Sequence, residues 1–105
     1  MTDYKTWRDF VISYVRTRAD AAGWVVRQVH RSRVSRSLYI HLRREGVRAV
    51  IRVSDHKPKV SEDFRHSMFS IRHGASTRLG ELDAWLQRRF QIVRDGWTTN
   101  RTCGQ

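Results

Sequence analysis

The chain has 105 residues, of which 39% are hydrophobic and 30% are charged. This length allows a single hydrophobic core, and the apolar content excludes a fully disordered chain, so we expect one soluble domain. No apolar run approaches the roughly 20 residues that a membrane-spanning helix needs, and the N-terminus lacks a secretory signal pattern. The single cysteine, Cys103, cannot form an internal disulfide. We therefore expect a reducing intracellular setting and no membrane partner.

Charge is the strongest compositional signal. Lysine and arginine total 21 against 10 aspartates and glutamates, which gives a net charge of +11, and 18 of the basic residues are arginine. Arginine binds phosphate or carboxylate through a planar fork, although codon usage in a GC-rich genome explains its preference over lysine equally well. Codon usage does not explain the net charge itself, which indicates an anionic partner.

The first expected element is a helix over residues 2–22, with Thr2 as its N-cap and Gly23 as its stop. Its apolar residues follow one helical stripe. Packing on a sheet explains this stripe better than a ligand-binding surface does, in spite of its aromatic content. The stripe consists of Tyr4, Trp7, Val11, Tyr14 and Val15, with Phe10 beside it.

Strands are expected next. Residues 24–31 are rich in β-branched side chains, and their imperfect alternation indicates an edge position or a bulge. Residues 31–37 form a polar, basic loop. A hairpin follows, in which apolar residues alternate along each arm and define one buried face. These residues are Leu38, Ile40 and Leu42 on the first arm, and Val47, Ala49, Ile51 and Val53 on the second.

Two loop lengths keep the apolar faces of the hairpin matched. A two-residue loop, Glu45-Gly46, pairs Leu42 with Ala49. A four-residue loop, residues 43–46, pairs Leu42 with Val47. Glutamate is a poor first residue of a type I′ or II′ turn, so we predict the four-residue loop.

The rest of the chain adds a fourth strand and a helix. Pro58 breaks regular structure. Residues 68–72 suit a strand with Phe69 and Ile71 inward. A helix over residues 77–90 starts at Ser76 or Thr77 and carries an apolar stripe. The stripe comprises Leu79, Leu82, Trp85, Leu86 and Phe90.

These elements predict an α+β domain over residues 1–93, followed by a loose polar tail over residues 94–105. The expected architecture is an N-terminal helix, an antiparallel sheet of three to four strands and a C-terminal helix. Both helices are expected on one face of the sheet, which leaves the other face open to solvent.

The positive charge concentrates in the sheet segment. Residues 27–52 contain eight arginines and a single acid, Glu45. On the outward side of the hairpin, arginines suit phosphate contacts, and the rings of Tyr39 and His41 suit base stacking. A solvated polar face is the alternative, although so dense a set of like charges costs stability.

We therefore expect a non-enzymatic protein without a cofactor that binds nucleic acid or a nucleoprotein complex. The sequence patterns of RRM, KH and zinc-finger domains are absent, so the partner within that class stays open, as does the oligomeric state. The predicted binding residues are Arg27, Arg31, Arg33, Arg36, Tyr39, His41, Arg43, Arg44, Arg48 and Arg52.

Two patterns suggest chemistry. Ser54-Asp55-His56 contains the residue types of a catalytic triad, but neighbours on an extended chain point to opposite sides, so we interpret it as a strand end. A metal-dependent nuclease using Asp55, His56, Asp63 and His66 is a weaker hypothesis, because their spacing is not a known ligand pattern. We assign no catalytic or metal-binding residue. Nucleotide-binding glycine motifs are absent.

The stretch SRSLYIHLRREGVRAVIRVSDH resembles a hairpin of small proteins from bacteriophages and mobile elements. In those proteins a Ser-x-x-Tyr arm leads to an arm ending in Arg-Val-Ser-Asp-His or close to it. The resemblance covers about a fifth of the chain and implies a phage context in the cytoplasm of a bacterial host. Small phage proteins include anti-CRISPR inhibitors of host defence, so docking on an acidic host protein is an alternative function by analogy. The matching positions are Ser37, Tyr39, Arg52, Val53, Ser54, Asp55 and His56, with one residue between the serine and the tyrosine here.

Overall fold

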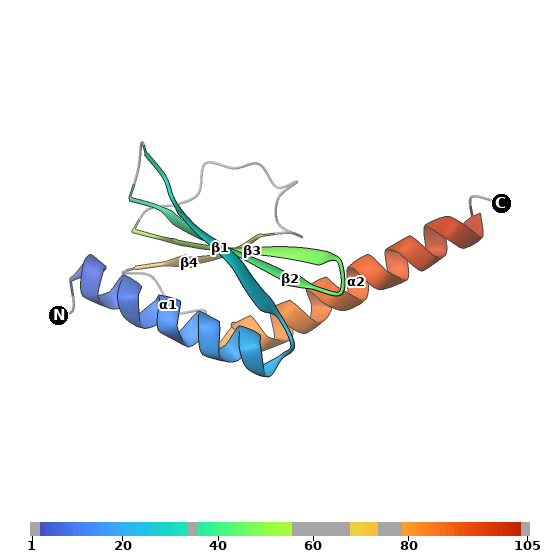
Figure 1. The fold of residues 1–105 in the computed structure, drawn as a ribbon, viewed down its shortest axis with the longest axis horizontal. Helices are drawn as coiled ribbons and strands as arrows, with labels where there is room; N and C mark the ends of the chain where they lie inside the picture. The colour runs from blue at the N-terminus through green and yellow to red at the C-terminus, as the bar shows by residue number, and fades with distance from the viewer. Residues whose placement is uncertain (1–2, 34–35, 56–67, 74–78, 104–105) are drawn as a thin grey trace.

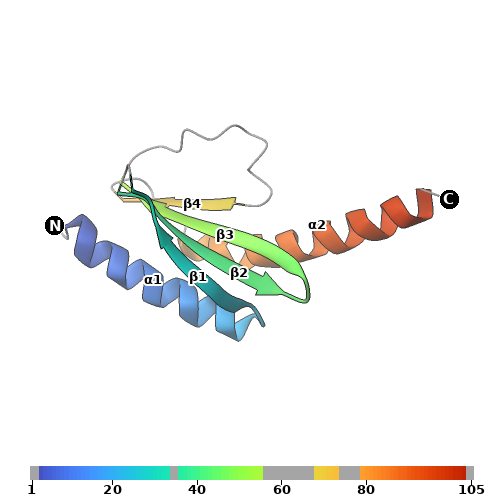
Figure 2. The ribbon, with the colours of Figure 1, turned by 45° about the horizontal axis from the view of Figure 1, so that its top comes forward.

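The computed structural model describes residues 3–33, 36–55, 68–73 and 79–103, and it describes side-chain surroundings as far as Val93. It confirms the α+β fold, with a helix, four strands and a second helix in chain order (Figure 1). Both helices pack on one face of the sheet, where their apolar stripes meet the strands in one core (Figure 2). The elements are α1 (Tyr4–Ala21), β1 (Val25–Arg31), β2 (Leu38–Arg44), β3 (Val47–Ser54), β4 (Met68–Arg72), the 3₁₀ turn η2 (Leu79–Glu81) and α2 (Leu82–Cys103).

The sheet is mostly antiparallel, with strand order β1-β2-β3-β4. β2 pairs antiparallel with both β1 and β3, as the sequence predicts. β4 lies parallel to β3, so that Val50 faces Met68 and Val53 faces Ile71. The expectation of a wholly antiparallel sheet was therefore wrong at this edge. A parallel neighbour needs a crossover connection of about a dozen residues, a length that the segment between these strands provides.

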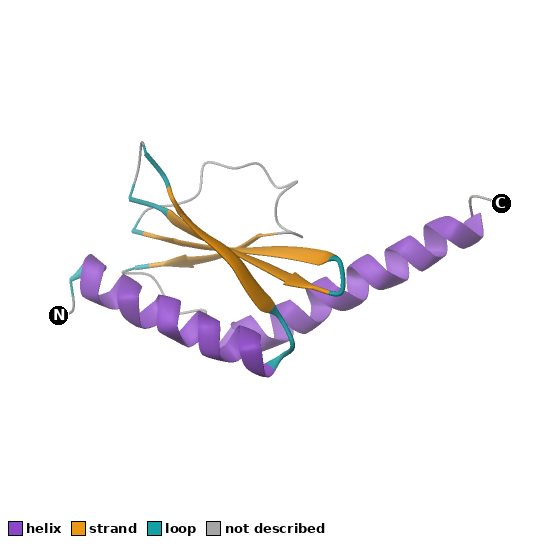
Figure 3. Cartoon of the chain, viewed as in Figure 1, coloured by secondary structure: helices purple, strands orange, loops and turns teal. Residues whose placement is uncertain are grey.

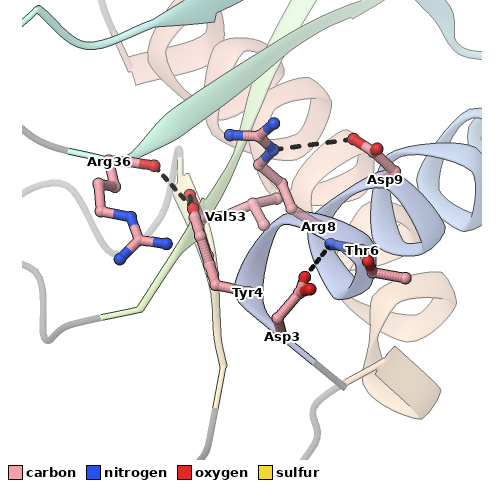
Figure 4. Close-up of polar contacts among 7 residues, drawn as sticks. All are labelled: Asp3, Tyr4, Thr6, Arg8, Asp9, Arg36 and Val53. Carbon is pink, nitrogen blue, oxygen red and sulfur yellow. Dashed lines mark hydrogen bonds and ion pairs between the residues drawn. The ribbon is translucent and has the colours of Figure 1, made fainter.

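Helix α1 begins at a cap that the sequence placed one residue early. Asp3, rather than Thr2, is the N-cap, and its Oδ1 accepts a hydrogen bond of 2.8 Å from the backbone N–H of Thr6 (Figure 4). That backbone bond holds the pKa of Asp3 below its usual value. At the other end, Gly23 has φ of 85°, a left-handed conformation that favours glycine.

The core lies between the sheet and the two helices. The alternate residues predicted to face inward on the hairpin are all buried, and so are Phe69 and Ile71 of β4. Helix α1 contributes Val11, Val15 and Ala19 from its inner stripe. The two helices are also joined at the surface, where the Arg18 guanidinium forms an ion pair with Asp83. From α2 the core takes Leu82, Trp85, Leu86 and Phe90.

The hairpin turn has two residues, so the prediction of a four-residue loop was wrong. Arg44 pairs with Val47 and Leu42 with Ala49, which leaves Glu45 and Gly46 as the turn. Their φ angles are 47° and 84°, and a two-residue type I′ turn requires positive φ at both positions. The turn matches the twist of the strands and brings both Arg43 and Arg44 into the ladder, which offsets the strain at Glu45.

Replacing Glu45 by asparagine is expected to raise the free energy of unfolding by about 0.5–1 kcal/mol, because asparagine tolerates the left-handed conformation that strains glutamate. Chemical denaturation measures the change. Glu45→Gln is the matched control, since it removes the same charge but keeps the strain. Equal stability of the two variants would contradict the geometry of this turn.

Helix α2 extends beyond the sheet. It continues to Cys103, so residues 94–103, expected as a loose tail, are helical. The helix continues through Gly96, because a single internal glycine costs only about 1 kcal/mol. The C-terminal turns project from the body in Figure 3. Within the described residues, no helix has both the length and the apolar character to cross a membrane.

Candidate nucleic-acid interface

The outer face is the side of the sheet opposite the helices. Strand register defines it, because residues paired across strands share a face. No described helix covers this side (Figure 2). Its four rows, from the hairpin turn to the far end, are Val25, Arg43 and Arg48; Gln28, His41, Val50 and Met68; His30, Tyr39, Arg52 and Ser70; and Ser54 and Arg72.

Exposed arginines gather at the hairpin turn. Arg43 and Arg48 face each other across β2 and β3, and both side chains are exposed. Arg27 is exposed at a bulge, where the register of β1 shifts between Val26 and Gln28. This bulge on an edge strand confirms the irregularity predicted for the first strand. Like charges directly opposite each other destabilise a strand pair, so an anion between Arg43 and Arg48 would stabilise it.

Aromatic rings occupy the middle of the outer face. The His30 ring on β1 lies 6.2 Å from the Tyr39 ring on β2, with an angle of 37° between the planes. His41 follows two residues after Tyr39 on the same face of β2. Tyr39 and His41 are half-buried and His30 is exposed, so the rings border solvent. A strip of rings therefore runs next to the arginines at the turn.

None of the four strands contains an aspartate or a glutamate. The nearest carboxylates in sequence belong to Glu45, in the turn, and Asp55, just after β3. Glu45 lies 3.9 Å from the Arg44 guanidinium, and Asp55 lies 3.2 Å from that of Arg36. The four strands therefore contribute only positive charge to the outer face.

The basic loop after β1 lies at the opposite end from the turn. Arg31, Arg33 and Arg36 are all exposed. The Arg36 guanidinium lies 4.7 Å from the Tyr4 ring centroid, and the Tyr4 hydroxyl donates to the Arg36 carbonyl at 2.7 Å (Figure 4). Burial, followed by the charge of Asp55, raises the pKa of Tyr4, so the phenol stays protonated at neutral pH. Helix α1 thus fixes the base of this loop.

Arg44 belongs to the other side of the sheet. It pairs with the buried Val47, and its guanidinium lies 4.1 Å from the ring centroid of Phe90 on α2. Nearby, Arg89 Nε donates to the Arg48 carbonyl at 2.8 Å, and partial burial lowers the pKa of Arg89. Arg44 and Arg89 therefore attach the hairpin turn to α2, and Arg44 does not face the outer side with Arg43.

Arg52 is buried, with 2% of its surface exposed, although the sequence suggested a surface contact. One guanidinium nitrogen donates to Ser37 Oγ at 3.1 Å and another to Ser70 Oγ at 3.2 Å. The side chain thus joins β3 to β4 and to the residue just before β2. Arginine has five donors in a rigid fork, which suits it to such a bridge.

Ser54 and Asp55 have structural partners. Ser54 is fully buried, and its carbonyl accepts a 2.8 Å hydrogen bond from the backbone N–H of His73. Asp55 pairs with Arg36. His56, Asp63 and His66 lie outside the described residues. Within the described ranges, no three His, Cys, Asp or Glu side chains are grouped as a metal site requires.

The outer-face residues that sequence reasoning did not assign to the binding surface include Gln28, His30 and Arg72. The bulge in β1 inverts the alternation, so the faces of Gln28 and His30 do not follow from a count along the strand. A position for Arg72 required the parallel pairing of β4. The sequence offered one signal for His30, which is its position near the end of a strand rich in β-branched residues.

Comparison with protein-family models, with curated proteins and with solved structures finds no match for this chain. The likeness to phage hairpins therefore depends on the short motif alone. Part of that motif has a structural explanation here, because Ser37, Arg52, Ser54 and Asp55 make the contacts described above. The geometry and charge of the outer face are therefore the basis for the proposed function below.

Proposed function

We propose that this chain is a non-enzymatic protein that binds nucleic acid through its outer face. The observation that carries the proposal is the combination of exposed arginines, half-exposed rings and strands without carboxylates on the side of the sheet that no described helix covers. Guanidinium forks bind phosphate, and rings stack on bases. The opposed pair Arg43 and Arg48 supports an anionic partner, since a bound phosphate offsets their repulsion.

The double substitution Arg43→Gln and Arg48→Gln tests the proposal. We expect affinity for an oligonucleotide of about 16 nucleotides to fall about 30-fold at low salt, because each charged contact is worth at least ~1 kcal/mol. The slope of log affinity against log salt should also become shallower, by about 0.7–0.9 for each phosphate contact removed. Fluorescence anisotropy between about 50 and 200 mM salt measures both quantities.

Lys5→Gln with Arg16→Gln is the matched control. Both side chains are exposed on α1, which packs on the opposite side of the sheet, and the pair removes the same charge. This control should lose much less affinity than the outer-face variant. Equal losses would mean that net charge alone causes binding, and affinity no better than about millimolar at low salt would refute nucleic-acid binding. A stoichiometric protein partner retained from a nuclease-treated host lysate would then favour docking on an acidic protein.

A further inference from the structure

We infer that the outer face selects single-stranded nucleic acid, with bases stacked on Tyr39 and its ring neighbours and phosphates at Arg43 and Arg48. This inference rests on the proposed function and specifies its ligand. The geometry of the rings supports the choice of a single strand, and the two arginines determine where its phosphate backbone lies. Duplex nucleic acid is the competing ligand.

The spacing of the rings suits an extended strand. The Tyr39 and His30 ring centroids are 6.2 Å apart, and the backbone positions of Tyr39 and His41, two residues apart on β2, are separated by about 6.6 Å. Successive nucleotides in a duplex strand are about 3.4 Å apart along the axis. Bases on neighbouring rings must therefore be unstacked from each other, which a single strand permits and a duplex does not.

Tyr39 lies between two neighbours on the outer face, which restrict its ring. On one side it pairs with His30 of the edge strand β1, and on the other it pairs with Arg52 of β3. The two serine contacts of Arg52 hold that buried neighbour in place. A ring that is already ordered loses little conformational entropy on binding, so more of the stacking energy contributes to affinity.

Arg43 and Arg48 lie one row from His41 and two rows from Tyr39 and His30. Arg43 follows His41 by two residues on the same face, so the guanidinium and the rings line one continuous path along β2. Bases in a duplex turn toward the partner strand, and only their edges reach the grooves. A sheet face with rings at its centre and cations at its end therefore fits a strand whose bases point toward the sheet.

The experiment compares Tyr39→Leu with Tyr39→Phe in the full chain. Tyr39→Leu should weaken binding to a single-stranded oligonucleotide about 5- to 150-fold, the range for loss of one stacked base. Tyr39→Phe should keep most of the affinity because the ring remains. The salt slope of Tyr39→Leu should match that of the wild type, since no phosphate contact is lost. Thermal unfolding of both variants checks that the fold is intact.

Phe10→Leu is the control for removal of an exposed ring, because Phe10 is 59% exposed on α1 and away from the outer face. It should leave affinity unchanged. Binding to a duplex of the same length should be weaker than to the single strand and insensitive to Tyr39→Leu. Unchanged single-strand affinity in Tyr39→Leu, or tighter binding of the duplex, would overturn the inference. In that case a continued loss in the Arg43 and Arg48 double variant would leave the proposed function standing.

Discussion

Replacing Arg52 by alanine is expected to lower the free energy of unfolding by about 3–4 kcal/mol. The substitution removes a buried side chain, for which truncation costs about 2–5 kcal/mol, and deprives Ser37 and Ser70 of a donor. It also removes the side-chain link that runs across β3 from Ser37, just before β2, to Ser70 of β4. Urea denaturation followed by far-ultraviolet circular dichroism measures the loss.

The control for this prediction is Arg48→Ala. Arg48 lies on the same strand and the same face, but its side chain is exposed and faces Arg43. Its removal should change stability by less than about 0.5 kcal/mol. Arg52→Lys should recover only part of the loss, because a single ammonium lacks the planar fork that reaches two hydroxyls. Equal effects at both positions would show that Arg52 is not a buried bridge.

Replacing Phe69 by alanine is expected to cost about 3–5 kcal/mol, the usual range for a buried phenylalanine. Phe69 is 1% exposed, faces Ile51 of β3 and lies 5.4 Å from the Trp85 ring of α2. Its removal opens a cavity between the sheet and the second helix, and thermal or urea unfolding detects the loss.

Met68→Ala is the neighbouring control. Met68 is half-buried on the outer face, so its truncation should cost about 1 kcal/mol or less. The contrast tests the register of β4 directly, because a slip by one residue exchanges the faces of Met68 and Phe69. A larger cost at Met68 than at Phe69 would contradict the pairing of β4 with β3.

The contacts of the arginines separate them into two groups. Arg52 and Arg44 have structural contacts, with serine hydroxyls and with the Phe90 ring. Arg43 and Arg48 are exposed on the outer face, and Arg27 is exposed at the bulge. In the binding experiments, the first group is therefore expected to alter stability and the second to alter affinity.

Much of the fold could be predicted from periodicity. The apolar stripes of α1 and α2 and the alternation of Leu38, Ile40 and Leu42 each encode one buried face. Burial of a repeating face is a local property, so a pattern with a period of 3.6 or 2 residues reveals it without knowledge of the neighbours. The concentration of arginine between residues 27 and 52 is equally visible in the sequence.

Other features required the whole fold. The turn at Glu45-Gly46 follows from the pairing of complete strands, which outweighs the poor fit of glutamate to positive φ. The parallel position of β4 depends on where a long connection returns the chain, and no local pattern encodes that.

By itself, the sequence determined the class of the fold, the buried side of each hairpin arm and the region that carries the positive charge. Only the tertiary structure decided which arginines face solvent. Arg43 and Arg52 have the same side-chain chemistry and lie on the same face, yet one is exposed and the other is buried between Ser37 and Ser70. Exposure of a long charged side chain depends on what neighbouring strands place beside it, and that information is distributed over residues far apart in the chain.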